Sequence, residues 1–188
     1  IQQQLSVNSD CQVGWGGYGE RRSLYKSDDP SNLFGGDGSE VRNIHLGIDV
    51  WSEAGTAITS PSSGIVVACT RNEGMGNYGP TLIIRVDENE CPYHILLGHL
   101  GGEVLDRWKI GDRVAAGTQV GTIGKWEENG NWPPHLHLQI IKNLPDNATD
   151  YEGVCSERLW PEFSANCPDP LPWLLKGCFP KEDASSAV

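Results

Sequence analysis

The sequence has no run of Lys or Arg long enough to follow a phosphate backbone. Its 14 basic residues face 25 acidic ones, for a formal net charge of −11. We therefore expect no nucleic-acid partner, and we interpret the acidity as favouring solubility. No apolar stretch approaches the ~18 residues that a membrane-spanning helix needs, so we expect no membrane span. No Gly-x-Ser-x-Gly sequence is present, so a serine nucleophile on a strained turn is not indicated.

The cysteines contain no Cys-x-x-Cys pair of the kind that structural zinc sites use. Their even number and wide spacing instead predict three disulfide bonds, an oxidising compartment and hence a secreted or periplasmic protein. Paired cysteines would also be poor nucleophiles. The chain starts at Ile1 rather than Met, so we expect a preceding segment to have been removed. The six cysteines are Cys11, Cys69, Cys91, Cys155, Cys167 and Cys178.

The 188 residues are long enough for one domain with its own core. Short β-branched runs at 64–68 and 81–86, separated by many of the 23 Gly and 12 Pro residues, predict a mostly β fold.

Three segments differ in composition. We expect residues 1–40, which are Gly-rich, to form an irregular arm, and residues 143–188, which are rich in Pro and Cys, to form a loop-rich extension. Residues 41–142 alternate short apolar runs with turns and contain every histidine, so we predict that they form the core. Within the core, 110–124 is interpreted as a compact hairpin.

Two short motifs in this core carry candidate metal ligands, because imidazole and carboxylate groups are standard zinc ligands. His135 and His137 alternate with apolar residues, as on a half-buried strand, and lie ~6.6 Å apart along it. Both rings can therefore approach one centre, and spacing does not decide which of them binds metal. In an extended strand His45 and Asp49 would lie ~13 Å apart, so the chain must bend between them. Gly47 permits such a bend through its backbone freedom.

The remaining histidines differ in their surroundings. His99 ends an apolar run before Gly101-Gly102, where clefts are often built, and is a candidate catalytic base or outer partner of the metal. His94 lies on the opposite face of the same strand and is interpreted as structural or solvated. Each histidine taken singly is best explained as a satisfied polar residue. Taken together, their recurrence in apolar strands favours a metal site.

A series of further motifs occurs in a fixed order around these residues. They are His45 to Asp49, Gly55-Thr56, Ser60-Pro61, Gly64-Ile65-Val66, Asn77-Tyr78-Gly79, His99-Leu100, Gly111 to Gly124 and Pro134-His135-Leu136-His137. In this order the chain resembles the lysostaphin and LytM type of zinc metallopeptidase, which cuts peptide cross-links of bacterial cell walls. The resemblance covers roughly residues 41–142 and implies a compact antiparallel β-sheet or sandwich core.

The resemblance also implies roles for individual residues. It implies one zinc ion per chain, bound by His45, Asp49 and His137, with His99 and His135 as the catalytic histidines. The implied reaction is peptide hydrolysis by a metal-activated water, and which histidine is the base stays open.

One departure from the family pattern concerns an aromatic ring. Family members often carry Tyr two residues before the His-Leu pair, where this chain has Leu97, so Tyr78 or Tyr93 is the candidate substitute, and Tyr78 is the candidate substrate contact.

The resulting functional prediction is a secreted, monomeric zinc endopeptidase acting on peptidoglycan peptides. Two alternatives stay open. One is a zinc-binding signalling or binding protein that keeps the fold without the activity. The other is a zinc peptidase with a glycine-rich substrate outside the wall. The presence of all five ligand and catalytic positions favours activity.

Overall fold

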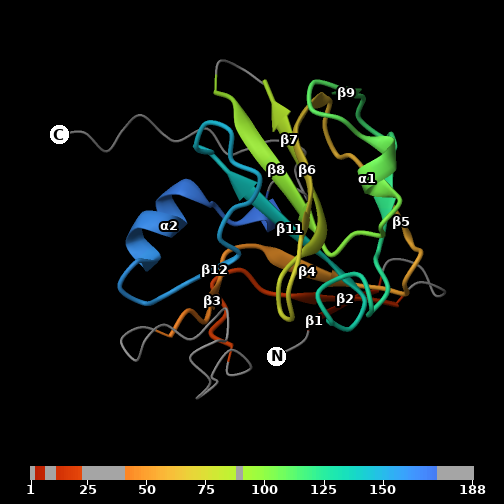
Figure 1. The fold of residues 1–188 in the computed structure, drawn as a ribbon. Coiled ribbons are helices and arrows are strands. Elements are labelled where there is room, and N and C mark those ends of the chain that lie inside the picture. The colour runs from red at the N-terminus through yellow and green to blue at the C-terminus, as the bar shows by residue number, and fades with distance from the viewer. Residues whose placement is uncertain (1–2, 7–11, 23–40, 88–90, 173–188) are drawn as a thin grey trace.

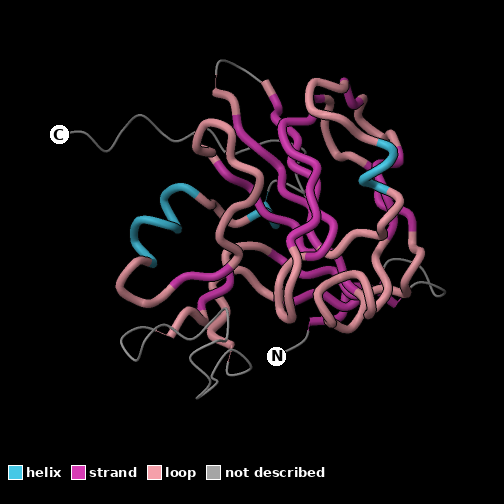
Figure 2. Tube along the Cα trace, viewed as in Figure 1, coloured by secondary structure: helices cyan, strands magenta, loops and turns pink. Residues whose placement is uncertain are grey.

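The structure, a computed structural model, describes residues 3–6, 12–22, 41–87 and 91–172. These residues contain twelve strands and two short helices, so the fold is mostly β, as the sequence predicts. Figure 2 shows strands and their connecting loops making up nearly all of the traced chain. Neither described helix is long and apolar enough to cross a membrane.

Eight strands form one large sheet, in which every pair of neighbours is antiparallel. In spatial order they are β1 (Gln3–Ser6), β2 (Gln12–Gly16), β4 (Ile48–Trp51), β11 (His135–Ile141), β8 (Tyr93–Gly98), β7 (Gly79–Val86), β6 (Gly64–Asn72) and β9 (Arg113–Val114). Strands β4 and β11 lie side by side, although they are far apart in the sequence (Figure 1). Their register places His137 opposite Asp49.

Two small strand pairs and two helices complete the described fold. Strand β12 (Val154–Cys155) pairs with β3 (Ile44–His45) so that Val154 lies opposite His45, which fixes the backbone of that histidine. In Figure 1 the two helices lie on opposite sides of the main sheet. The remaining elements are β3 (Ile44–His45), β5 (Ala57–Thr59), β10 (Gln119–Thr122), β12 (Val154–Cys155), α1 (Val104–Arg107) and α2 (Trp160–Asn166).

The central strands are buried on both faces of the sheet. Along β7, Leu82 and Ile84 pack into one hydrophobic cluster, whereas Ile83 between them packs into a second cluster on the other face. This double burial explains why 81–86 reads as a nearly continuous apolar run rather than an alternating one. Full burial of each such side chain stabilises the fold by about 1.5–3 kcal/mol, so the strands beside the site rest on a rigid core.

The prediction of an irregular arm is wrong for part of residues 1–40. Strands β1 and β2 form a hairpin, and β2 pairs with β4 so that Gly16 lies opposite Asp49. Without β2, strand β4 would present an unpaired edge. Pairing of this kind uses backbone groups, so a Gly-rich sequence carries little signal of it. Residues 23–40 lie outside the described part of the chain.

The hairpin predicted at 110–124 is also wrong in its pairing. The positive φ angles of Gly111 (95°) and Gly117 (78°) bear out the glycine turns. However, β9 pairs with β6, and β10 pairs with β5, so the two strands do not pair with each other. The turns separate two strands that bond to different partners.

The prediction of three disulfide bonds is wrong for the described cysteines. Cys69, Cys91, Cys155 and Cys167 are all free, and Cys11 and Cys178 lie outside the described residues. Cys155 and Cys167 are buried in the second hydrophobic cluster. Burial, together with the neighbouring thiol in the case of Cys155, raises the pKa of each thiol to about 11, so both behave as small apolar residues. The four free thiols remove the basis for inferring an oxidising compartment.

Candidate metal centre

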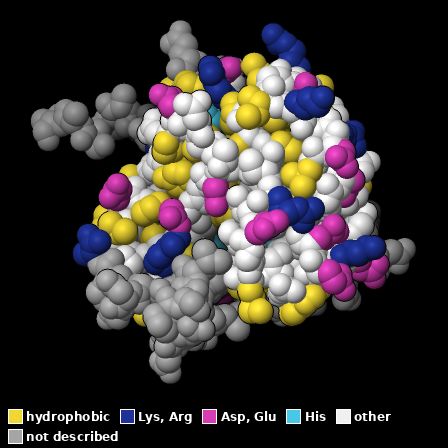
Figure 3. Space-filling view, in the orientation of Figure 1, with side chains coloured by type: hydrophobic (Ala, Val, Ile, Leu, Met, Phe, Trp, Pro, Cys, Tyr) yellow, Lys and Arg dark blue, Asp and Glu magenta, His cyan; other side chains and the backbone are white. Residues whose placement is uncertain are grey.

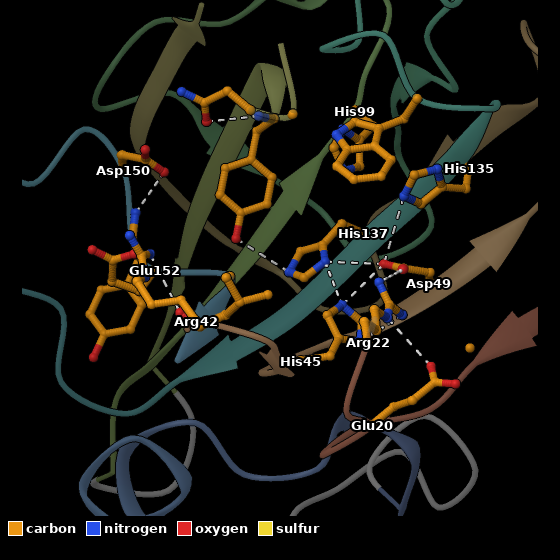
Figure 4. A pocket seen from close by; sticks show the side chains of 18 of the residues that line it. Glu20, Arg22, Arg42, His45, Asp49, His99, His135, His137, Asp150 and Glu152 are labelled. Carbon is orange, nitrogen blue, oxygen red and sulfur yellow. Dashed lines mark hydrogen bonds and ion pairs between the residues drawn. The ribbon is translucent and has the colours of Figure 1, made fainter. Parts of the chain in front are cut away.

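Three side chains from three strands converge on one buried point. His45 ends β3, Asp49 lies in β4 and His137 lies in β11. The Nε2 atom of His45 lies 3.0 Å from Nδ1 of His137 and 3.2 Å from Oδ1 of Asp49, and the third side of this triangle measures 3.1 Å. All three residues are at most 3% exposed. Figure 4 shows the two rings and the carboxylate pointing toward one another.

This triangle fits a zinc ion. Ligand atoms at ~2.0–2.1 Å from a tetrahedral zinc lie about 3.3 Å apart, close to the observed 3.0–3.2 Å. Two imidazoles and one carboxylate are an ordinary catalytic zinc set, which leaves one position for water or substrate. The residues present therefore fit a zinc ion without rearrangement of the strands.

The chain bends between His45 and Asp49, as their spacing demands, and Gly47 lies in that bend. The reason for a glycine here differs from the one predicted. Gly47 does not have a positive φ, so its backbone freedom is not what the bend uses. A Cβ atom at this position would lie 2.6 Å from the Leu138 carbonyl oxygen and 2.8 Å from Nε2 of His137. Gly47 is needed because the Leu138 carbonyl oxygen and the ring of a candidate ligand, His137, together occupy the space of its side chain.

Gly47→Ala is therefore expected to displace the His137 ring. Overpacking of this kind costs about 1–3 kcal/mol of stability, and zinc affinity should fall because one ligand moves. Urea unfolding and competition with a chromophoric chelator measure the two effects. Gly121→Ala is the matched control, since its Cβ would meet nothing closer than 3.8 Å. A Gly47→Ala protein with unchanged stability and zinc affinity would contradict the steric argument.

Arg22 of the N-terminal segment binds the outer side of the centre. Its Nη1 atom lies 2.6 Å from Oδ2 of Asp49, and its Nε atom lies 3.4 Å from the carboxylate of Glu20 (Figure 4). Burial alone would raise the pKa of the Asp49 carboxyl, but the adjacent His45 and His137 outweigh it and hold this pKa well below its usual range. The carboxylate is therefore ionised at neutral pH and available to a cation. Sequence reasoning missed Arg22, because its position depends on the unpredicted pairing of β2 with β4.

His99 and His135 lie next to each other at the edge of this centre, with ring centroids 4.3 Å apart. Nδ1 of His99 donates to the Asn129 carbonyl at 2.9 Å, and Nδ1 of His135 donates to the Pro133 carbonyl at 2.6 Å. Because a carbonyl oxygen only accepts, both rings carry their proton on Nδ1. Their Nε2 atoms keep a lone pair, and that of His135 lies 3.8 Å from Oδ1 of Asp49.

The surroundings keep these two histidines neutral. Burial holds the pKa of His99 well below its ordinary value, with His135 and His137 adding to the effect, and burial also lowers the pKa of His135. A neutral imidazole can take up a proton, whereas an imidazolium cannot. His99 also has a φ of 62°, a strained value for a residue with a side chain, which is a feature that clusters at functional sites.

A cleft of about 690 Å³, whose walls are rich in aromatic rings, is lined by the three candidate ligands and the two neighbouring histidines: His45, Asp49, His137, His99 and His135. Trp51 stacks on His135, with ring centroids 4.4 Å apart, and Trp132 meets the same ring edge-on. Tyr78 also lines the cleft, and its hydroxyl lies 3.4 Å from Nε2 of His137. Neither the Trp51 stack nor Trp132 was predicted as part of the site. Because side chains alternate along a strand, Trp51 lies on the same face of β4 as Asp49. This spacing of two residues is the feature of the sequence from which Trp51 could have been predicted.

The far end of the cleft carries charged side chains. Arg42 forms an ion pair with Glu152, and Asp150 lies close by (Figure 4). The molecular face in Figure 3 intersperses acidic and basic side chains, while histidine is almost hidden from view. His94 lies outside the cleft lining and donates to the Ile141 carbonyl at 3.3 Å, in agreement with its interpretation as structural.

Comparison with known proteins gives matches over the same region. The sequence matches the family model described as peptidase family M23 over residues 43–150. Uncharacterised proteins of Mycobacterium bovis and Mycobacterium tuberculosis are each 31% identical over 134 residues, which is 71% of this chain and 30% of theirs. Lysostaphin of Staphylococcus staphylolyticus is 33% identical over 106 residues, 56% of this chain and 20% of that protein. The chain thus spans less than a third of the length of the curated relatives it matches.

Solved structures agree on the fold. The structure of lysostaphin from Staphylococcus simulans superimposes with a TM-score of 0.52 at 23% identity, covering 92% of this chain and 54% of that one. The catalytic domain of the same protein gives a TM-score of 0.50 at 23% identity, covering 86% of this chain and 91% of that domain. At this identity the likeness concerns the fold, and it bears out the predicted antiparallel β architecture.

Proposed function

Because the chain belongs to peptidase family M23, we propose that it is a zinc metalloendopeptidase that hydrolyses peptide bonds in peptidoglycan, and that it is secreted because this substrate lies outside the cell. The observation that carries this proposal is the triangle of His45, Asp49 and His137 beside two neutral histidines in one cleft. The match to lysostaphin supports the class of substrate. We place the catalytic core in residues 41–142, with 1–40 and 143–188 as extensions of the same domain.

The proposed chemistry divides the site into ligands and proton carriers. His45, Asp49 and His137 would hold the metal through Nε2, Oδ1 and Nδ1. Bound zinc supplies a Lewis acid that polarises the scissile carbonyl and makes a water at the open position more acidic. The aromatic walls exclude bulk water from the cleft and orient the peptide.

His135 and His99 would handle the proton. The Nε2 atom of His135 lies 3.8 Å from Oδ1 of Asp49, which places it beside the centre, so we assign it the proton of the attacking water. Its Nδ1–H bond to the Pro133 carbonyl stabilises the imidazolium that results. This imidazolium can then return the proton to the leaving amine. We assign His99 to orienting the water and the substrate carbonyl from the other side.

A direct test compares two substrates with purified, zinc-loaded protein. Cross-linked muropeptides should be cleaved, and a chelator should abolish cleavage until zinc is restored. His94→Ala is the matched control, because this histidine lies outside the cleft and its loss should leave turnover unchanged. Cleavage of pentaglycine alone would favour the glycine-rich substrate, whereas zinc-bound protein that cleaves neither would leave the binding-protein alternative and refute the peptidase.

A further inference from the structure

Gln139 is a fully buried polar residue directly behind the candidate metal centre. It lies in β11 two residues after His137, on the same face of the strand, and is 0% exposed. Its Oε1 atom lies 3.0 Å from Nε2 of His137. Its Nε2 atom lies 3.0 Å from the Glu152 carbonyl oxygen and 3.3 Å from Sγ of Cys167. Both ends of the amide therefore have partners.

The partner on the Glu152 side fixes the orientation of this amide. A carbonyl oxygen can only accept a hydrogen bond, so the group facing Glu152 must be the NH₂ end of Gln139. Rotation of the amide by half a turn would bring two acceptor oxygens together and leave the fully buried NH₂ group without its carbonyl acceptor. The Oε1 atom must then face His137, and it too can only accept.

The orientation of the amide determines the tautomer of the histidine. To donate to Oε1, His137 must carry its proton on Nε2, so its lone pair lies on Nδ1. Nδ1 is the atom that faces His45 at 3.0 Å and Asp49 at 3.1 Å. We propose that Gln139 is a positioning residue that holds His137 in the tautomer able to bind metal, an inference that rests on the proposed zinc peptidase.

Such a device is needed because Asp49 acts in the opposite direction. Its Oδ1 atom, 3.1 Å from Nδ1 of His137, would favour the proton on Nδ1 when no metal is bound, and that tautomer cannot ligate through this atom. The Tyr78 hydroxyl lies 3.4 Å from Nε2 of His137, but a hydroxyl rotates and both donates and accepts. Of these three described groups, the amide held by the Glu152 carbonyl is the one that favours the proton on Nε2.

The test combines the metal-free protein with variants at this position. In metal-free wild type, long-range ¹H–¹⁵N spectra should show His137 protonated on Nε2. Gln139→Met, which keeps the length of the side chain, should lose this preference and bind zinc about 10–100-fold more weakly by chelator competition. Gln139→Glu keeps an acceptor for His137, and its carboxylic acid form keeps a donor for the Glu152 carbonyl oxygen, so it should recover most of that loss. Ile141→Val, fully buried on the same face of β11, is the control for altered packing and should leave zinc affinity unchanged.

Each result decides the inference. A folded Gln139→Met protein with wild-type zinc affinity, or a metal-free wild type with His137 protonated on Nδ1, would overturn it. If Gln139→Met fails to fold, the wild-type spectrum and the Gln139→Glu protein still decide. A protein that responds to Gln139 as described yet cleaves no peptide would refute the proposed peptidase and leave the positioning role intact.

Discussion

His135→Ala is expected to lower turnover by about 10²–10⁴-fold, the range for loss of a general acid–base group, while zinc affinity stays within about threefold of wild type. The reason is its position beside the ligand triangle. Its Nε2 atom lies 3.8 Å from Oδ1 of Asp49, and its Nδ1–H group donates a hydrogen bond to the Pro133 carbonyl. The measurements are kcat on a cross-linked muropeptide and zinc affinity by chelator competition on the same preparation.

His99→Ala gives the comparison that separates the two proton roles. If His135 takes the proton of the water, kcat should fall at low pH as His135 becomes protonated, so its removal should abolish this acidic limb of the pH profile, whereas removal of His99 should lower kcat without altering the profile's shape. His94→Ala again serves as the control outside the cleft. Loss of zinc from His135→Ala would show that His135 rather than His137 is a ligand, and the division of the site proposed above would be wrong.

The register of two strands explains why sequence spacing left that division open. His135 and His137 occupy the same face of β11, so alternation makes them equivalent. In the structure His137 lies opposite Asp49, whereas His135 lies opposite Trp51. The first therefore lies within hydrogen-bond distance of the carboxylate, at 3.1 Å, whereas the second stays 3.8 Å away and stacks on an indole ring. The resemblance to a known family supplied a ligand set that the residues alone did not determine, and this register places two of its members, Asp49 and His137, opposite each other.

Other parts of the site had no readable signal in the sequence. Arg22 reaches Asp49 because β2 pairs with β4, and that pairing is made by backbone groups in a Gly-rich segment. Gly47 was expected for the bend, but the need for it comes from the His137 ring and the Leu138 carbonyl oxygen, about ninety positions further along the chain. The number of cysteines predicted disulfide bonds, whereas in the structure Cys155 and Cys167 are free thiols packed in a hydrophobic cluster. In each case the decisive contact is long-range.

His137→Ala is expected to abolish zinc retention and, with it, all zinc-dependent turnover. Removal of a ligand leaves two protein ligands where a catalytic zinc site uses three. The loss of affinity should therefore exceed the roughly 10–100-fold expected for Gln139→Met, which keeps the ligand and alters only its support. Thermal unfolding with and without zinc measures this directly, because a ligand present at 100 times its Kd stabilises the folded state by about 2.7 kcal/mol.

The wild-type protein should show such a zinc-dependent shift in Tm, and His137→Ala should show none. The comparison is made within each protein, so the destabilisation caused by the cavity cancels. The two variants are then distinguished by two measurements. His135→Ala keeps the zinc-dependent shift in Tm and loses turnover, whereas His137→Ala loses both. A His137→Ala protein whose Tm still rises with zinc would place the ion elsewhere. In that case the buried triangle of His45, Asp49 and His137 would be a hydrogen-bonded cluster within the core rather than a metal site.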